Sequence, residues 1–172
     1  MKLKIVLAFL GLHLLASAQT KTMPVEGGLS FTMNIPAYLS KTAGINTAAA
    51  LQFKSVVKDI YGIVIYDTKE ELLALEMKFN NAQDFYDNFI TDFVKDEEQR
   101  EVSRPESKFI NGNSIVLADL TYFDKDAKSK IYYKIGVIES AKAFYKVLIW
   151  CDASKRKTFE KDFEEAVMSL KD

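Results

Sequence analysis

Apolar and polar residues alternate along the first third of the chain in a pattern typical of strands. Residues 29–35 alternate and stop at Pro36, which predicts a first strand. Residues 61–66 are rich in β-branched and aromatic side chains and predict another. Residues 47–58 are ambiguous. Their alternation favours a strand, whereas the alanines that open the segment would also tolerate a helix.

Helical spacing appears in the middle and at the end of the chain. Residues 69–75 predict a short helix, and Asn81 is a suitable cap for a longer one, with Asp84 in its first turn. The polar run 95–101 ends that helix. A final helix is expected over residues 155–170, capped by Ser154. The apolar faces of the two longer helices are Ala82, Phe85, Phe89, Ile90 and Phe93, and Phe159, Phe163, Val167 and Leu170.

Four strands are predicted between these two helices. The segment 102–110 contains Pro105, which suits an edge strand because proline cannot donate to a central ladder. Asn111-Gly112 predicts a tight hairpin turn into the strand 114–123. After a turn at 124–129 come strands 131–138 and 144–151. The last is apolar on both faces, as in a central strand that is covered on two sides.

These elements predict one domain of the α+β class over residues 29–172, preceded by a flexible lead-in at 19–28. We expect a three-layer α/β/α sandwich, with a largely antiparallel central sheet of about six or seven strands and helices on both faces. A central strand that is apolar on both sides needs cover on each, and the two aromatic-faced helices can supply it.

Residues 1–18 have the features of a secretory signal peptide. A basic start is followed by an apolar run over residues 5–16 and by the small-residue cleavage pattern Ala16-Ser17-Ala18. Gln19 stands where a lipoprotein would carry its acylated cysteine. We therefore expect an exported protein, periplasmic or secreted, with neither a lipid anchor nor a transmembrane segment.

Composition narrows the chemistry that this exported form can perform. His13 is the only histidine and leaves with the signal, which excludes Ser-His-Asp triads and zinc sites that contain histidine. Two of the 23 basic residues leave as well, so 21 face 24 acidic ones and the net charge is −3. That balance gives no support for nucleic acid or an anionic membrane surface as a partner. Cys151 is alone, which precludes an intrachain disulfide, and its apolar neighbours predict burial.

The remaining motifs predict no catalytic, cofactor-binding or metal site. The Ser-x-x-Lys patterns Ser55–Lys58 and Ser154–Lys157 are at the frequency expected by chance and lack supporting motifs. A calcium-loop start at Asp124 fails at the later ligand positions. We expect a protein that is not an enzyme and needs no cofactor.

Two groups of residues are candidates for binding. Basic residues near one end of the last two hairpins could dock an acidic partner, although ordinary solvated loop ends would carry the same charges. Aromatic residues on the two helices could line an apolar pocket between helix and sheet, although core packing would place them there as well. The basic group is Lys125, Lys128, Lys130, Lys155, Arg156 and Lys157; the aromatic group is Phe85, Phe89, Phe93, Phe159 and Phe163.

The order of elements resembles the PsbP and Mog families of α/β/α domains over most of residues 29–170. The resemblance rests on the opening strand that ends at Pro36 before Tyr38, on the Asn111-Gly112 hairpin, on the aromatic strand at 144–150 and on the terminal helix. It implies an accessory role through contacts with other macromolecules. We therefore expect a non-enzymatic interaction domain of the bacterial cell envelope, with another envelope protein as partner. The alternative is a carrier of a small apolar ligand.

Overall fold

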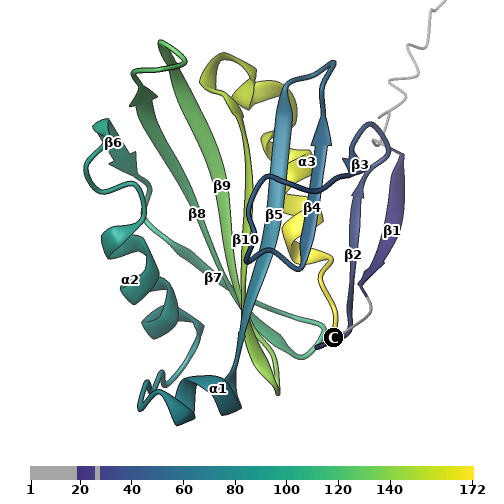
Figure 1. Ribbon diagram of the computed structural model, residues 1–172, viewed down its shortest axis with the longest axis vertical. Helices are drawn as coiled ribbons and strands as arrows, with labels where there is room; N and C mark the ends of the chain where they lie inside the picture. The colour runs from purple at the N-terminus through teal and green to yellow at the C-terminus, as the bar shows by residue number, and fades with distance from the viewer. Residues whose placement is uncertain (1–18, 26–27) are drawn as a thin grey trace, which may run out of the picture.

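The computed structural model describes residues 19–25 and 28–172, so the expected signal peptide lies outside the described residues. Most of the chain forms one antiparallel sheet of eight strands with the spatial order β3-β4-β5-β10-β9-β8-β6, in which β7 also pairs with β8 (Figure 1). Its strands are β3 (Ser40–Lys41), β4 (Leu51–Ser55), β5 (Ile60–Thr68), β6 (Glu98–Val102), β7 (Glu106–Ile110), β8 (Asn113–Asp124), β9 (Ser129–Glu139) and β10 (Ala143–Asp152).

Strand β10 is central, as its sequence predicts. It lies between β5 and β9, and its side chains alternate between two core clusters. Tyr145 and Val147 belong to one cluster, whereas Phe144 and Leu148 belong to the other. Each face of the sheet therefore has its own apolar core, because successive side chains of a strand point to opposite faces.

The first core is covered by a helix together with a second small sheet. Strands β1 (Thr20–Val25) and β2 (Phe31–Pro36) pair antiparallel, and Met33 of β2 is completely buried. Helix α3 (Arg156–Met168) places Phe163 in the same cluster. The segment expected to be a flexible lead-in is thus strand β1 from Thr20 to Val25. The sequence predicts a strand at β2 but not at β1, because the alternating run of β1 is short.

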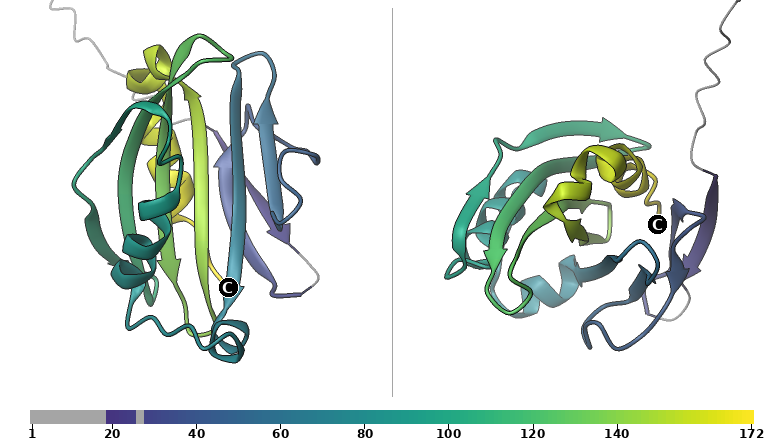
Figure 2. Two further views of the ribbon diagram at one scale, coloured as in Figure 1. Left: turned by 60° about the vertical axis from the view of Figure 1, so that its left-hand side comes forward. Right: turned by 90° about the horizontal axis from the view of Figure 1, so that it is seen from above.

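The second core contains residues of α1 (Lys69–Ala74) and α2 (Ala82–Asp92). Only the N-terminal half of α2 is buried, through Ala82, Phe85 and Tyr86. Figure 2 shows this helix in front of the long strands in the left-hand view. The α+β class and the antiparallel sheet are confirmed. The expected helix layers on both faces are not, since a β-hairpin shares one face and half of α2 stands only partly buried on the other.

Local turn and cap signals are mostly confirmed. Asn111 and Gly112 have φ values of 55° and 84°, as a two-residue hairpin requires, and the Asn81 side chain accepts a hydrogen bond from the Asp84 amide at 3.0 Å. The predicted strand 102–110 is interrupted near Pro105, so that β6 and β7 pair with β8 one after the other. Ser154 does not cap α3. Asp152 instead caps a short 3-10 turn over Ala153–Lys155 that precedes the helix.

Candidate functional site

A row of aromatic side chains crosses one face of the sheet. Tyr61 on β5, Trp150 on β10 and Tyr133 on β9 lie directly opposite one another in register. Their ring centroids are 5.7 and 5.3 Å apart, with planes inclined by 23° and 20°. Tyr122 on β8 extends the row at 6.1 Å from Tyr133. Such stacked pairs stabilise a sheet and also present a broad apolar surface.

An open groove of about 360 Å³ lies between this row and the C-terminal half of α2. Phe93 contacts Tyr133 edge-to-face at 5.5 Å, and Phe89 packs beside Phe93 at 4.9 Å. We call this feature the aromatic groove. It is lined by Ile45, Asn46, Ile63, Ile65, Phe89, Phe93, Tyr133, Lys146, Leu148 and Trp150.

Hydrogen bonds hold both walls of the aromatic groove in place. The Gln52 side chain accepts from the amides of Ile45 and Asn46 at 2.7 and 3.1 Å and donates to the Asn46 carbonyl at 2.9 Å. On the other wall, the Arg100 guanidinium donates to the carbonyls of Ile90 and Phe93 at 2.6 and 3.1 Å. These bonds give hydrogen-bond donors to carbonyl groups at the C-terminal end of α2. The groove is therefore preformed, which lowers the entropy cost of binding.

The charge inside the groove is already neutralised. Lys146 pairs with Asp67 at 2.7 Å and lies over the ring of Phe85. Burial raises the pKa of the Tyr133 phenol further above its ordinary value of 10, and this side chain is therefore uncharged. The groove therefore offers apolar contact and stacking rather than a charge or an acid-base group. A ligand or partner would bind through its own apolar or aromatic groups.

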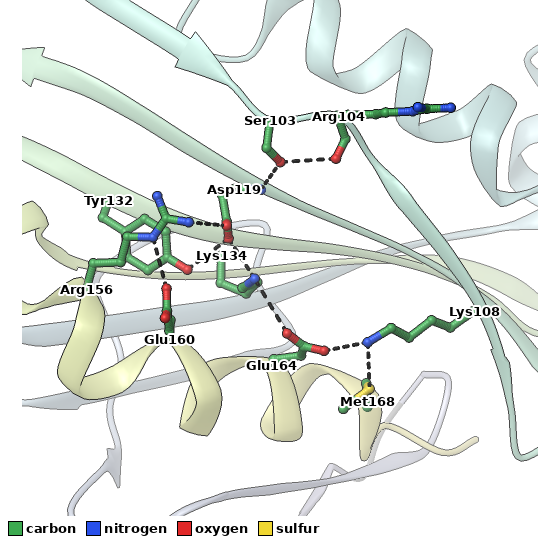
Figure 3. A network of polar contacts seen from close by, with 10 residues as sticks. All are labelled: Ser103, Arg104, Lys108, Asp119, Tyr132, Lys134, Arg156, Glu160, Glu164 and Met168. Carbon is green, nitrogen blue, oxygen red and sulfur yellow. Dashed lines mark hydrogen bonds and ion pairs between the residues drawn. The ribbon is translucent and has the colours of Figure 1, made fainter.

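A second conspicuous feature is a network of charges between α3 and the other face of the sheet (Figure 3). Asp119 on β8 is its centre. One carboxylate oxygen accepts from the Tyr132 hydroxyl at 2.8 Å and lies 2.6 Å from the Lys134 ammonium, while the other lies 2.6 Å from Arg156. The Lys134 side chain is only 9% exposed. Burial, with Asp119 adjacent, raises the pKa of the Tyr132 phenol.

The rest of this network balances the same charges. Arg156 also binds Glu160 at 3.0 Å, and Glu164 bridges Lys134 and Lys108. Figure 3 shows the side chains of α3 pointing toward the strands that they join. Every charged group drawn between α3 and the sheet has a partner of opposite sign. The network therefore anchors the helix to the sheet.

The five phenylalanines expected around one pocket do not meet. Phe89 and Phe93 line the aromatic groove. Phe85 stacks on Phe144 at 4.7 Å within the second core, and Phe159 and Phe163 belong to the first core. Sequence reasoning missed Tyr61, Tyr133 and Trp150. Each could have been placed on one face by strand alternation, but their alignment into a row depends on the register between strands.

The predicted basic patch lies at one end of the sheet, because Asp152 at the end of β10 pairs with Ile131 near the start of β9. Most of its charges have acidic neighbours. The pairs are Lys125–Glu98, Lys130–Glu101, Lys155–Asp59 and Arg156–Asp119. Within the described part of the chain, Lys128 and Lys157 of this patch make no ion pair.

The other motifs have structural contacts. The Ser55 hydroxyl accepts from the Lys58 amide, and the Ser154 hydroxyl donates to Asp152, so neither serine contacts the lysine amine three residues on. The Asp124 carboxylate accepts from the amides of the turn that follows it. Residues 19–25 and 28–172 hold no cluster of potential metal ligands and no helix long and apolar enough to cross a membrane.

Comparison with known proteins identifies the fold. No protein-family model and no curated protein sequence matches the chain. Among solved structures, it is similar to cyanobacterial PsbP (CyanoP) from Synechocystis sp. PCC 6803, with a TM-score of 0.63 and 12% identity over 91% of this chain and 94% of that one. The Saccharomyces cerevisiae Ran-binding protein Mog1p gives 0.64 and 10% over 90% and 96%.

A third similar structure is LpqN, which is involved in cell envelope biogenesis of Mycobacterium tuberculosis. It gives a TM-score of 0.52 and 11% identity over 88% of this chain and 90% of that one. The chain therefore has a PsbP/Mog1-like fold, and the resemblance predicted from the sequence is confirmed at the level of the fold. Sequence identities this low establish similarity of fold but not of function.

Proposed function

We propose that this chain is an exported, non-enzymatic accessory domain that binds another protein of the cell envelope through the aromatic groove. The observation that carries the proposal is the preformed groove floored by Tyr133 and Trp150, which offers stacking surface and a neutralised ion pair. Aromatic residues that combine a large apolar area with few rotatable bonds are enriched where proteins bind each other.

The shape of the groove favours a protein segment over an enclosed ligand. The groove is open along one side, while the adjacent core is filled by the stacked rings of Phe85 and Phe144. An apolar side chain on a partner can enter such a groove while the rest of the partner rests on the sheet. Similarity of fold to a Ran-binding protein and to a protein of envelope biogenesis is consistent with this role.

The second candidate is a carrier of a small apolar ligand in the same groove. The cavity volume of about 360 Å³ favours it, because ligand sites begin at roughly 300 Å³. In that case the occupant would be a single small molecule that stacks on Trp150.

Native mass spectrometry of the protein isolated gently from its own cell envelope distinguishes the two candidates. We expect an added protein mass that is lost in the double variant Phe89→Ala, Trp150→Ala, which removes two side chains that line the groove. Phe109→Ala is the matched control, because Phe109 is an exposed aromatic residue on β7 outside the groove. Thermal unfolding of each variant establishes that it is folded.

An added mass of small-molecule size would support the carrier and contradict the first candidate. A protein mass that persists in the double variant would place the binding surface elsewhere and contradict the role of the groove.

A further inference from the structure

Strand β7 leaves one of its edges without a neighbouring strand. It pairs with β8 over Glu106–Ile110, and within the described residues it pairs with no other strand. In the right-hand view of Figure 2 it runs along the outside of the curved sheet. Phe109 on this strand is 74% exposed. An open strand edge presents unpaired backbone groups with which another chain can pair.

The other strand edges of the described chain are protected against such pairing. Strand β3, at the far side of the sheet, has only two residues. Strand β6 is irregular, with a shift in register between Glu98 and Glu101. Strand β1, at the edge of the small sheet, contains Pro24, which cannot donate to a ladder. Short length, bulges and prolines are the usual ways to protect an edge, and β7 has none of them within its five residues.

The hairpin determines which backbone groups of β7 face outward. Ile110 and Asn113 flank the two-residue turn and form its hydrogen-bonded pair, so that every second residue back along β7 bonds to β8. The N–H and C=O groups of Ser107 and Phe109 therefore point away from β8. Pro105, directly before β7, occupies the next outward position and offers only a carbonyl, because proline has no N–H.

This edge is complementary to the same edge of a second copy. Two copies of β7 that run antiparallel around Ser107 place Glu106 of each opposite Lys108 of the other. The two Ser107 residues then exchange N–H···O=C bonds, and each Phe109 N–H donates to the Pro105 carbonyl across the pair. A pair centred on Lys108 would form as many backbone bonds but would set two lysines opposite each other, which is destabilising. The charges therefore select the register around Ser107.

The other charges near β7 are compatible with this register. Lys108 is paired with Glu164 on α3, and both side chains are 32% exposed, so that the ammonium group can contact a second carboxylate. Glu106 is exposed and makes no ion pair within residues 19–25 and 28–172. Arg104 is exposed as well and falls opposite the apolar Ile110 of the second copy.

The α2 side of the edge leaves room for the second copy. An open groove of about 460 Å³ lies between Phe109 and the start of α2, where Ala82 and Gln83 line it. Among the described residues that line this groove, Lys108 alone is charged. In the register around Ser107, the Phe109 ring of each copy lies opposite Pro105 of the other and gains an apolar contact there.

We propose that two copies of this chain associate through their β7 edges into a symmetric dimer with one continuous antiparallel sheet. The contact is isologous, because the same strand of both copies takes part. It is weak and reversible, since it consists of a few backbone hydrogen bonds with one ion pair and one aromatic contact at each end. The aromatic groove is lined by no residue of β7, so the dimer does not depend on the function proposed for that groove.

Sedimentation velocity of the exported protein at increasing concentration tests the proposal. We expect a monomer that converts to a dimer as the concentration rises. Ser107→Pro should abolish the dimer, because it removes the central N–H donor but leaves the hydrogen bonds between β7 and β8 in place. Ser107→Ala retains that N–H group and is the matched control, which should dimerise as the unaltered protein does. Thermal unfolding of both variants establishes that they are folded.

A change of charge tests the register. Glu106→Lys sets like charges opposite each other at both ends of the pair and should weaken the dimer about tenfold. Glu97→Lys makes the same change at an exposed position before β6 and should leave the dimer unchanged. Equal weakening by the two variants would contradict the register, because it would reflect net charge alone.

Three further results would overturn the proposal. The protein would remain a monomer at every concentration, or Ser107→Pro would dimerise as well as Ser107→Ala, or both variants would lose the dimer equally. A dimer that is lost in Phe89→Ala, Trp150→Ala and kept in Ser107→Pro would assign the contact to the aromatic groove instead. A second copy doubles the mass of the chain, which distinguishes it from a different envelope protein bound in that groove.

Discussion

Asp119 holds the last helix against the sheet through three side chains at once. Its carboxylate contacts Tyr132, Lys134 and Arg156, and its side chain is 18% exposed. In such a setting the attraction between the charges offsets their lost hydration only while every partner is present. Removing the central carboxylate charge would leave Lys134 with only the more distant Glu164, at 3.8 Å.

We therefore predict that Asp119→Asn lowers the free energy of unfolding by about 3 kcal/mol. Glu160→Gln, which removes a half-exposed partner of Arg156 on the same helix, should cost less than about 1 kcal/mol. Denaturant unfolding of both variants measures the difference. Equal losses in the two variants would show that the buried carboxylate has no special role.

Cys151 is the second residue for which the structure supports a specific prediction, on the reactivity of its thiol. Burial raises the pKa of its thiol from 9.0 to about 11, so that the reactive thiolate is scarce in the folded protein. We predict that a thiol reagent at pH 8 labels Cys151 only when the protein unfolds. The same shift leaves the free energy of unfolding unchanged below pH 9 and lowers it between pH 9 and 11, because the unfolded thiol ionises first. Rapid labelling of the folded protein would contradict this account.

At the level of elements, the approach of α3 to the sheet depends on Gly136. This residue lies on β9, and a Cβ atom there would meet the side chain of Val167 on α3. The glycine therefore sets how closely the helix packs on the central strands. The first core, with Phe163 and Val167 fully buried, depends on that distance.

Gly136→Ala should lower the free energy of unfolding by about 1–3 kcal/mol through overpacking. Adding Val167→Ala should restore part of the loss, because the smaller side chain makes room for the new methyl group. Thermal unfolding of both single variants and the double variant gives the coupling between the two sites. Strictly additive losses would contradict direct contact between Gly136 and Val167.

Elements whose signals are local were predictable. Asn111-Gly112 defines its own turn, and Asn81 caps α2, because each depends on residues close in the sequence. Long-range pairing was not predictable. The strand Thr20–Val25 is a strand only because β2 pairs with it, and Pro105 divides an edge strand whose two parts both bind β8.

The candidate site was predictable in part for the same reason. Helical spacing placed Phe89 and Phe93 on one face of the predicted helix, and in the structure Phe89 of α2 and Phe93 directly after it form one wall of the aromatic groove. The floor requires Trp150 on β10 and Tyr133 on β9 to lie opposite one another, and that register depends on how the two strands pair. Tyr61 joins the row from β5, a strand far away in the chain. The same spacing could not show that Phe159 and Phe163 belong to the opposite core.

At the scale of the whole molecule, the sheet separates two surfaces with different properties. One face is closed by α3 and the small β1–β2 sheet, and the other carries the aromatic groove. The groove therefore lies on the face of the sheet opposite α3.

The measurement that tests the groove most directly is the fluorescence of Trp150, because it is the only tryptophan in the chain and lies in the groove itself. Emission from the isolated protein is compared with emission from the complex recovered from the cell envelope, after subtraction of the partner's own signal. We predict a shift to shorter wavelength and protection from a soluble quencher in the complex. Unchanged emission and unchanged quenching while the partner stays bound would contradict the assignment of the aromatic groove as the binding site.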